Sequence, residues 1–242
     1  MEVPTKDATQ VAQDDATPVT QDITLTYFAG WGLAEQGRWC MAAAQIPFKN
    51  RALSTHAEFC SLRDSGTLMF GQLPLLEIDG LRLVQSQAIC RYVAKRAGMA
   101  GQSPSEEAQV DMVAEAVRDA RAGVTGFPFT DNPRQHAQQN MMRLMVKQLP
   151  WIEAAIESSG TGTVCPSGLT YADVLVAEML DGYRYFLPDG WLDGFPSCKA
   201  LHAKVLSMPG VAAYLASPER HPFPQGEVGD AYVRNVQEVL HG

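Results

Sequence analysis

Two short apolar runs joined by Asp79-Gly80 constrain the fold of this 242-residue chain more than any other stretch. The two runs make up Leu75–Val84, and an Asp-Gly dipeptide between such runs is a strong signal for a two-residue β-hairpin loop. Pro74 stands at the entry of the first strand, where a missing N–H is tolerated. Ser86 follows the hairpin and is expected to be the N-cap of an amphipathic helix.

The residues around the hairpin also predict a small binding edge. Pro74 leaves the N–H and C=O of Leu73 free on an open edge, and an extended peptide could pair with them. The carboxylate of that peptide could lie on the N-terminus of the helix that begins at Ser86. These residues alone leave open the alternative of an ordinary hairpin and helix without a ligand.

The composition suits a compact protein with sizeable cores, since 46% of the residues are hydrophobic and 19% are charged. A net charge of −8 argues against nucleic acid or an anionic membrane as the main partner. No apolar run approaches the length of a membrane span. The chain has five cysteines without a C-x-x-C or a metal-ligand spacing, which favours reduced core thiols in a cytoplasmic protein. They are Cys40, Cys60, Cys90, Cys165 and Cys198.

Three regions follow one another along the chain. Residues 1–22 are polar and acidic and are expected to be a disordered tail. Residues 23–98 have the order β-α-β-α-β-β-α of a thioredoxin-like fold, an α/β arrangement. A linker leads to residues 104–242, where every long segment has helical period. The expected strands are Ile23–Ala29, Phe48–Leu53 and the hairpin, and the expected helices are Leu33–Gln45, Ala57–Asp64, Ser86–Ala97, Glu106–Phe127, Pro133–Ser158, Thr170–Phe186, Cys198–Ser207, Val211–Ala216 and Asp230–Leu240.

The first strand ends where thioredoxins carry their C-x-x-C motif. That place holds Ala29-Gly30-Trp31-Gly32. The protein therefore brings no redox thiol of its own to the site. Any thiol chemistry there needs a thiol from a ligand.

Several motifs in this order resemble a cytosolic glutathione transferase, most of all the alpha, mu and sigma classes. The resemblance covers roughly residues 23 to 240, and each motif is weak by itself. The motifs are Leu25-Thr26-Tyr27-Phe28, Leu68-Met69-Phe70-Gly71-Gln72-Leu73-Pro74, Ile78-Asp79-Gly80, Gln85-Ser86, Thr170-Tyr171-Ala172-Asp173 and Phe195-Pro196.

The resemblance implies a thioredoxin-like glutathione-binding domain (23–98) followed by an all-helical domain (104–242). It implies that Tyr27 is the catalytic residue and donates a hydrogen bond to the glutathione thiolate. Glutathione would be a cosubstrate, the electrophile would be small and hydrophobic, and no metal would be needed. The residues that would hold glutathione are Tyr27, Arg63, Gln72, Leu73, Pro74, Gln85, Ser86, Asp119 and Lys147.

Arg63 would face the glycyl carboxylate, while Gln72 and Leu73 would pair with the cysteinyl unit beside a cis Leu73–Pro74 bond. Gln85 and Ser86 would hold the γ-glutamyl carboxylate. Asp119 falls where an acidic residue reaches the γ-glutamyl amine of the neighbouring subunit, with Lys147 nearby. Phe70 falls where a phenylalanine wedges into the partner of a homodimer. The electrophile pocket would be lined by Phe28, Trp31, Val124, Phe129, Tyr232, Val236 and Leu240.

Two residues depart from the family pattern beside the thiolate. Leu33 stands where alpha and sigma enzymes have an arginine that supports the thiolate, and mu enzymes have leucine. Trp31 replaces an arginine common to all three classes. The thiolate would then depend mainly on Tyr27 and on the N-terminus of the first helix.

The sequence leaves three functions open. The first is conjugation of glutathione to hydrophobic electrophiles in detoxification, and the second is a glutathione-dependent isomerisation of the sigma type. The third is a non-catalytic glutathione-binding or structural role. The retained Tyr27 and Gln85-Ser86 favour the first two.

Overall fold

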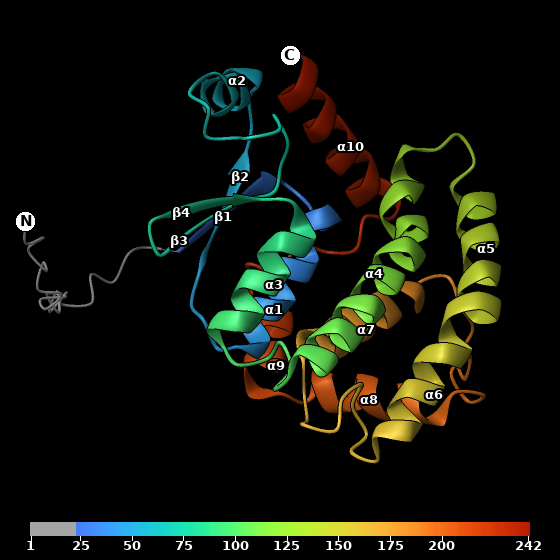
Figure 1. Ribbon diagram of the computed structural model, residues 1–242. Coiled ribbons are helices and arrows are strands. Elements are labelled where there is room, and N and C mark those ends of the chain that lie inside the picture. Colours follow the sequence, from blue (N-terminus) through green and yellow to red (C-terminus); the bar gives the residue numbers. More distant parts are fainter. Residues whose placement is uncertain (1–22) are drawn as a thin grey trace, which may run out of the picture.

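The computed structural model describes residues 23–242, except for the side chains of Arg134 and Ala137 (Figure 1). The predicted disordered tail, residues 1–22, lies outside the described residues. The predicted fold class is confirmed, because a sheet with flanking helices is followed by a part built from helices.

A four-stranded mixed sheet forms the first part, in the order β2-β1-β3-β4. β1 pairs in parallel with β2 and antiparallel with β3, so it lies inside the sheet. Helices α1 and α3 pack against each other and against the central helix of the second part (Figure 1). The elements are β1 Thr24–Phe28, the 3-10 turn Gly32–Ala34, α1 Glu35–Ala43, β2 Lys49–Leu53, α2 His56–Asp64, β3 Leu75–Ile78, β4 Leu81–Val84 and α3 Ser86–Arg96.

The predicted hairpin is present, and its loop is Asp79-Gly80. Both loop residues have left-handed backbone angles, with φ of 51° and 74°. Such angles are required at both central positions of a type I′ turn, and Asp and Gly tolerate them best. Ile78 pairs with Leu81, so the loop has two residues as expected. The Leu73–Pro74 bond is cis, also as expected.

The prediction that Ser86 caps α3 is wrong. Gln85 occupies the N-cap position with φ of 72°, and Ser86 is the first helical residue. The first helical hydrogen bond runs from the Ile89 N–H to the Gln85 carbonyl. The Ser86 N–H therefore belongs to the first turn, whose donors have no partner inside the helix and are available to a ligand.

The second part surrounds α7, which is buried along its whole length. Thr170 and Asp173 hold the start of α7, since the Asp173 carboxylate accepts from the Thr170 N–H and hydroxyl, each at 2.7 Å. The elements are α4 Pro104–Gly126, the 3-10 turn Phe127–Phe129, α5 Pro133–Arg143, the π segment Leu144–Gln148, α6 Leu149–Ser159, α7 Tyr171–Tyr183, α8 Pro196–Leu206, α9 Pro209–Ala216 and α10 Gly226–His241.

The single helix expected over residues 133–158 is interrupted. A π segment at Leu144–Gln148 separates α5 from α6. Pro150, in the first turn of α6, has no N–H, and its ring would clash with the carbonyl of residue 146 in a regular α-helix. A local π turn is a common way to absorb such an interruption.

α10 lies against the sheet part, although it is the last element of the chain (Figure 1). The Asn235 side chain fixes this position, because it accepts a hydrogen bond from the Ala29 N–H at 2.7 Å and donates one to the Leu53 carbonyl at 3.0 Å. These two residues stand at the ends of neighbouring parallel strands. α10 therefore closes one side of the region where β1 ends.

Candidate functional site

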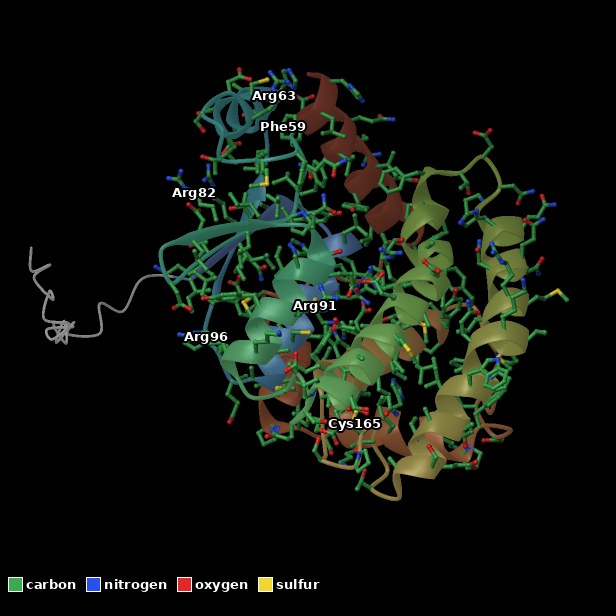
Figure 2. The ribbon with its side chains drawn as sticks, viewed as in Figure 1. Phe59, Arg63, Arg82, Arg91, Arg96 and Cys165 are labelled. Carbon is green, nitrogen blue, oxygen red and sulfur yellow. The ribbon has the colours of Figure 1, made fainter. Side chains whose placement is uncertain are left out.

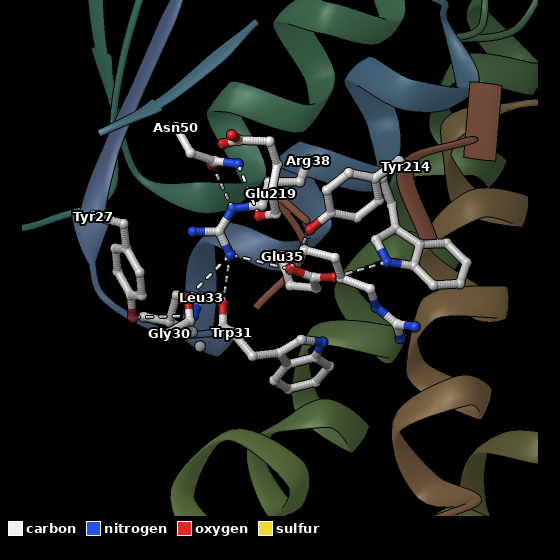
Figure 3. Close-up of polar contacts among 12 residues, drawn as sticks. Tyr27, Gly30, Trp31, Leu33, Glu35, Arg38, Asn50, Tyr214 and Glu219 are labelled. Atoms are coloured by element: carbon white, nitrogen blue, oxygen red, sulfur yellow. Dashed lines mark hydrogen bonds and ion pairs between the residues drawn. The ribbon is translucent and has the colours of Figure 1, made fainter. Parts of the chain in front are cut away.

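Tyr27 lies near the end of β1 and is 4% exposed. Its hydroxyl oxygen accepts a hydrogen bond from the Leu33 N–H at 3.0 Å (Figure 3). It also lies 3.4 Å from the hydroxyl of Tyr232 on α10. Because Leu33 supplies a donor, the O–H proton of Tyr27 stays available for another acceptor.

Gly32 allows this close approach of backbone and tyrosine. Its φ is +40°, a left-handed angle that suits glycine. A Cβ at this position would lie 2.6 Å from the Tyr27 hydroxyl oxygen and would also collide with the Tyr232 hydroxyl. The first strand, the 3-10 turn and α10 therefore converge on one small space.

The backbone carbonyls before that turn are held by a buried arginine. Arg38 on α1 donates to the carbonyl oxygens of Gly30 at 3.0 Å and Trp31 at 3.2 Å (Figure 3). Glu35 neutralises Arg38 at 3.1 Å and also accepts from the Tyr214 hydroxyl. This network orders the loop that follows Tyr27.

A cavity of about 250 Å³ opens beside Tyr27. Four of the predicted pocket residues line it, namely Phe28, Phe129, Tyr232 and Val236. The remaining lining is Tyr27, Gly32, Leu33, Thr125 and Gly126. The cavity is therefore mostly apolar, with the Tyr27 and Tyr232 hydroxyls as polar groups. Burial and the neighbouring Tyr27 raise the pKa of Tyr232, which keeps that second hydroxyl protonated.

Trp31, Val124 and Leu240 do not line this cavity, contrary to expectation. Trp31 is buried elsewhere, with its ring 4.2 Å from the guanidinium carbon of Arg121 and edge-on to Phe223. Val124 is fully buried in the helical core. Leu240 is half-buried and packs against the core close to the end of α10. Helical period identified their apolar faces but not the element that covers each face.

The predicted glutathione-binding edge is open along Gln72 and Gln85. Both side chains are exposed, and the Gln85 amide donates to the Gln72 carbonyl oxygen at 3.0 Å. The structure thus brings the end of the loop before β3 together with the start of α3. Ser86 lies beside Gln85 as the first residue of α3.

Arg63 lies on α2 at the rim of the molecule, with its guanidinium carbon 5.8 Å from the ring centroid of Phe59 on the same helix (Figure 2). Its side chain is 45% exposed and pairs with Asp64 at 2.8 Å. One guanidinium nitrogen is 3.4 Å from the Cys60 sulfur. Its position beside Gly71 places it near the Gln72 loop, and an exposed pair with Asp64 is weak enough to be exchanged for a ligand carboxylate.

Comparison with known proteins decides the family. The family model described as "Glutathione S-transferase, N-terminal domain" matches residues 23–95, and "Glutathione S-transferase, C-terminal domain" matches residues 118–218. The rat protein "Glutathione S-transferase alpha-5" is 35% identical over 202 residues, which are 82% of this chain and 91% of the relative. The chain belongs to the glutathione S-transferase family.

Solved structures agree with this assignment. Monomeric Na-GST-3 from Necator americanus has a TM-score of 0.70 and 32% identity, covering 80% of this chain and 96% of that one. Prostaglandin synthase D of Nilaparvata lugens has a TM-score of 0.65 and 25% identity, covering 81% and 98%. The protein is accordingly a glutathione transferase with the fold of its relatives.

The transferase places Asp119 and Lys147 in different cavities. Asp119 is exposed on α4 and lines a polar cavity of about 410 Å³. Lys147, in the π segment, lines a separate groove. Arg143, four residues before Lys147, lines the same cavity as Asp119. Sequence reasoning missed Arg143, because it treated this stretch as one helix. Arg143 ends α5, and Lys147 lies in the π segment that follows, so the two cations line different cavities.

Arg121 is a second residue of the transferase that sequence reasoning missed. It is 2% exposed and pairs with Glu178 of α7, with both nitrogen–oxygen distances at 2.7 Å. It also donates to the Gly32 carbonyl at 2.8 Å. Its long separation from both partners in the chain left no sequence signal.

Within residues 23–242, no cluster of three or more His, Cys, Asp or Glu side chains could hold a metal ion. In the same range, no helix has both the length and the apolar character that crossing a membrane requires. Of the five cysteines, four are buried and none forms a disulfide. Burial raises the pKa of Cys165, labelled in Figure 2, to about 11, so this thiol stays protonated at neutral pH.

Proposed function

We propose that this transferase conjugates glutathione to small hydrophobic electrophiles in the cytoplasm and uses Tyr27 as its catalytic residue. The observation that carries the proposal is the bond from the Leu33 N–H to the Tyr27 oxygen at 3.0 Å. This donor leaves the Tyr27 O–H proton for a sulfur in the adjacent cavity. A free thiol has a pKa of about 8.5, and a donor aimed at the sulfur favours the thiolate.

Glutathione would lie along the exposed edge from Gln72 to Ser86. The Leu73 backbone would pair with its cysteinyl unit, and the first-turn N–H groups of α3 would receive the γ-glutamyl carboxylate. Arg63 would reach the glycyl carboxylate. The open position of Gln72 and Gln85 and the cis Leu73–Pro74 bond support this arrangement.

Ligand binding should raise the melting temperature, because only the folded chain has this edge. At a concentration one hundred times the Kd, the expected stabilisation is about 2.7 kcal/mol, or roughly 5–10 °C. S-hexyl glutathione should be effective at lower concentration, since its alkyl tail would enter the apolar cavity lined by Phe28 and Phe129. Differential scanning fluorimetry would measure both ligands.

Arg63→Ala should weaken glutathione binding by roughly twofold to fivefold, as expected for an exposed charge pair. Arg82→Ala is the control, because Arg82 is also an exposed arginine with a carboxylate neighbour but lies on β4 (Figure 2). Equal weakening in the two variants would remove Arg63 from the site. No temperature shift at millimolar ligand would leave only the structural role.

We also propose that the transferase is a two-fold homodimer. Phe70 is 61% exposed, while Leu68 in the same loop is buried and anchors it. A groove of about 910 Å³ lies between α4 and α6, and exposed Met112 and Trp151 form part of its wall. An exposed aromatic ring and an open apolar groove on one chain fit the two halves of a self-complementary interface.

Phe70→Ala should weaken dimerisation by about 2–4 kcal/mol, in the range of hot-spot truncations. Trp151→Ala should have an effect of similar size, because it alters the other half of the same contact. Leu81→Ala is the control, since Leu81 is an exposed apolar residue in the hairpin. Sedimentation velocity at micromolar concentration would measure all three, and a monomeric wild type, like the relative described as monomeric, would overturn the dimer and the role of Asp119 across it.

A glutathione-dependent isomerase is the second candidate, supported by the similarity to a prostaglandin synthase of Nilaparvata lugens. An isomerase uses the same thiolate but releases glutathione unchanged. Mass spectrometry of the products from a generic aryl halide separates the two functions. A glutathione adduct supports conjugation, whereas binding without any adduct favours the isomerase or a non-catalytic role.

A further inference from the structure

One peptide group beside the site is held at both ends. The N–H of Leu33 donates to the Tyr27 hydroxyl oxygen at 3.0 Å. The carbonyl of Gly32, the other end of the same peptide plane, accepts from Arg121 at 2.8 Å. A planar amide thus connects a buried guanidinium to the tyrosine.

Hydrogen bonds and a ring contact fix the orientation of Arg121. Its Nε and Nη2 atoms donate to the two Glu178 oxygens, and Nη2 also donates to Gly32. Its guanidinium carbon lies over the Trp31 ring, 4.2 Å from the ring centroid. A guanidinium that is 2% exposed and held in this way cannot change rotamer without leaving polar groups unpaired.

We propose that Arg121 is a positioning residue for Tyr27 and acts through the Gly32–Leu33 peptide. The inference rests on the proposed role of Tyr27. Hydrogen bonds in a chain polarise one another, so a guanidinium on the carbonyl strengthens the N–H as a donor. The stronger N–H in turn strengthens the Tyr27 O–H as a donor to sulfur.

The contact, and not a long-range field, transmits the effect. Glu178 lies 2.7 Å from Arg121, and where its carboxyl is ionised it cancels most of the arginine's charge at a distance. Arg38 is the nearest comparison, because it is also buried and neutralised by a glutamate. Arg38 binds the carbonyls of Gly30 and Trp31, which precede the peptide that touches Tyr27.

The test replaces the buried pair as a unit, Arg121→Met with Glu178→Met. An apolar pair of similar volume is often tolerated where one lone charge is not. The variant should fold and should change KM for glutathione by less than about twofold. At pH 6.5, kcat should fall roughly tenfold, as expected for a misplaced catalytic group, and the pKa of bound glutathione should rise by about one unit.

A Tyr27→Phe background separates positioning from general structure. Without the Tyr27 hydroxyl, the Met pair should cause no further loss of kcat. Arg91→Met is the matched control. Arg91 on α3 pairs with Asp111 of α4 at a nitrogen–oxygen distance of 3.0 Å, and neither residue touches the Gly32–Leu33 peptide (Figure 2). The same tenfold loss in both backgrounds, or in the Arg91 control, would overturn the inference.

Two further measurements keep the inference testable. If the Met pair fails to fold, Arg121→Lys keeps the charge but cannot supply the same fork and carbonyl bond, so kcat should fall and KM should not. The ¹³Cζ NMR signal of Tyr27 in the ligand-free protein should move in either variant and not in the Arg91 control. If the Tyr27 signal moves in these variants but the wild-type protein shows no turnover, the proposed function is refuted and the role of Arg121 is not. If the signal does not move, the role of Arg121 is refuted.

Discussion

Tyr27→Phe is expected to lower the rate of conjugation at neutral pH by at least about tenfold, and removal of a preorganised donor of this kind typically costs 10²–10³. Leu33 lines this cavity, and its apolar side chain supplies no cation to a bound sulfur. Tyr27 therefore supplies most of the proposed thiolate stabilisation. The variant should stay folded and keep most of its affinity for glutathione.

The pH dependence of this loss tests the mechanism. The loss should shrink as the pH rises towards about 8.5, because solvent then forms the thiolate without the hydroxyl. Rate profiles of both forms, with thiolate absorbance followed in parallel, would show this. An equal loss at every pH would mean that Tyr27 positions the substrate and does not favour its thiolate.

Tyr232→Phe is the matched control for Tyr27→Phe. It removes a hydroxyl that lies 3.4 Å from that of Tyr27, but one that comes from α10 and does not receive the Leu33 N–H. The rate should change by less than about threefold, well below the loss of a primary donor. A larger loss in Tyr232→Phe than in Tyr27→Phe would assign sulfur activation to Tyr232.

Local chemistry explains which parts of the fold were predictable. Asp79 and Gly80 tolerate the left-handed angles of a two-residue loop, so the hairpin could be placed to the residue. Tyr27 could be placed near the end of a strand because the following Gly30 and Gly32 break the pattern. The N-cap of α3 was placed one residue too late, at Ser86. Gln85 takes that position with a backbone φ of 72°, an angle that a glutamine side chain does not signal.

Long-range contacts explain the rest. Tyr27 meets Tyr232, which is 205 residues away, and Gly32 meets Arg121, which is 89 residues away. Helical period shows that a face is apolar but does not identify the surface that covers it. Trp31 was therefore assigned to the cavity, although its ring packs against Arg121, which binds the Gly32 carbonyl next to it in the chain.

Glu178 should make the protein less stable as the pH rises from about 5 to about 7. Burial raises the pKa of this carboxyl to about 7, against the opposing attraction of Arg121. The unfolded chain loses this proton near pH 4.5, so between these values the folded state holds a proton that the unfolded state has released. Stability must then fall with rising pH in this window, by at most about 1.4 kcal/mol for each pH unit.

Glu178→Gln should remove this slope, because the amide keeps an acceptor for Arg121 but cannot ionise. Glu153→Gln is the matched control at a second buried glutamate. Burial opposes ionisation there too, but the N–H groups of Ser197 and Cys198 hold the pKa of Glu153 below its ordinary value. Its contribution is complete above that ordinary value and is lost only in more acidic solution, so Glu153→Gln should lower stability by a constant amount between pH 5 and 7.

Urea unfolding at fixed protein concentration would measure these free energies at several pH values. The wild-type curve minus the Glu178→Gln curve should slope downwards with pH, and the Glu153→Gln difference should be flat. If the free-energy difference between wild type and Glu178→Gln is as flat with pH as that for Glu153→Gln, then Glu178 is already ionised at pH 5. In that case the attraction of Arg121 outweighs the burial of the carboxyl, and the pair that holds Gly32 is a full ion pair throughout the physiological range.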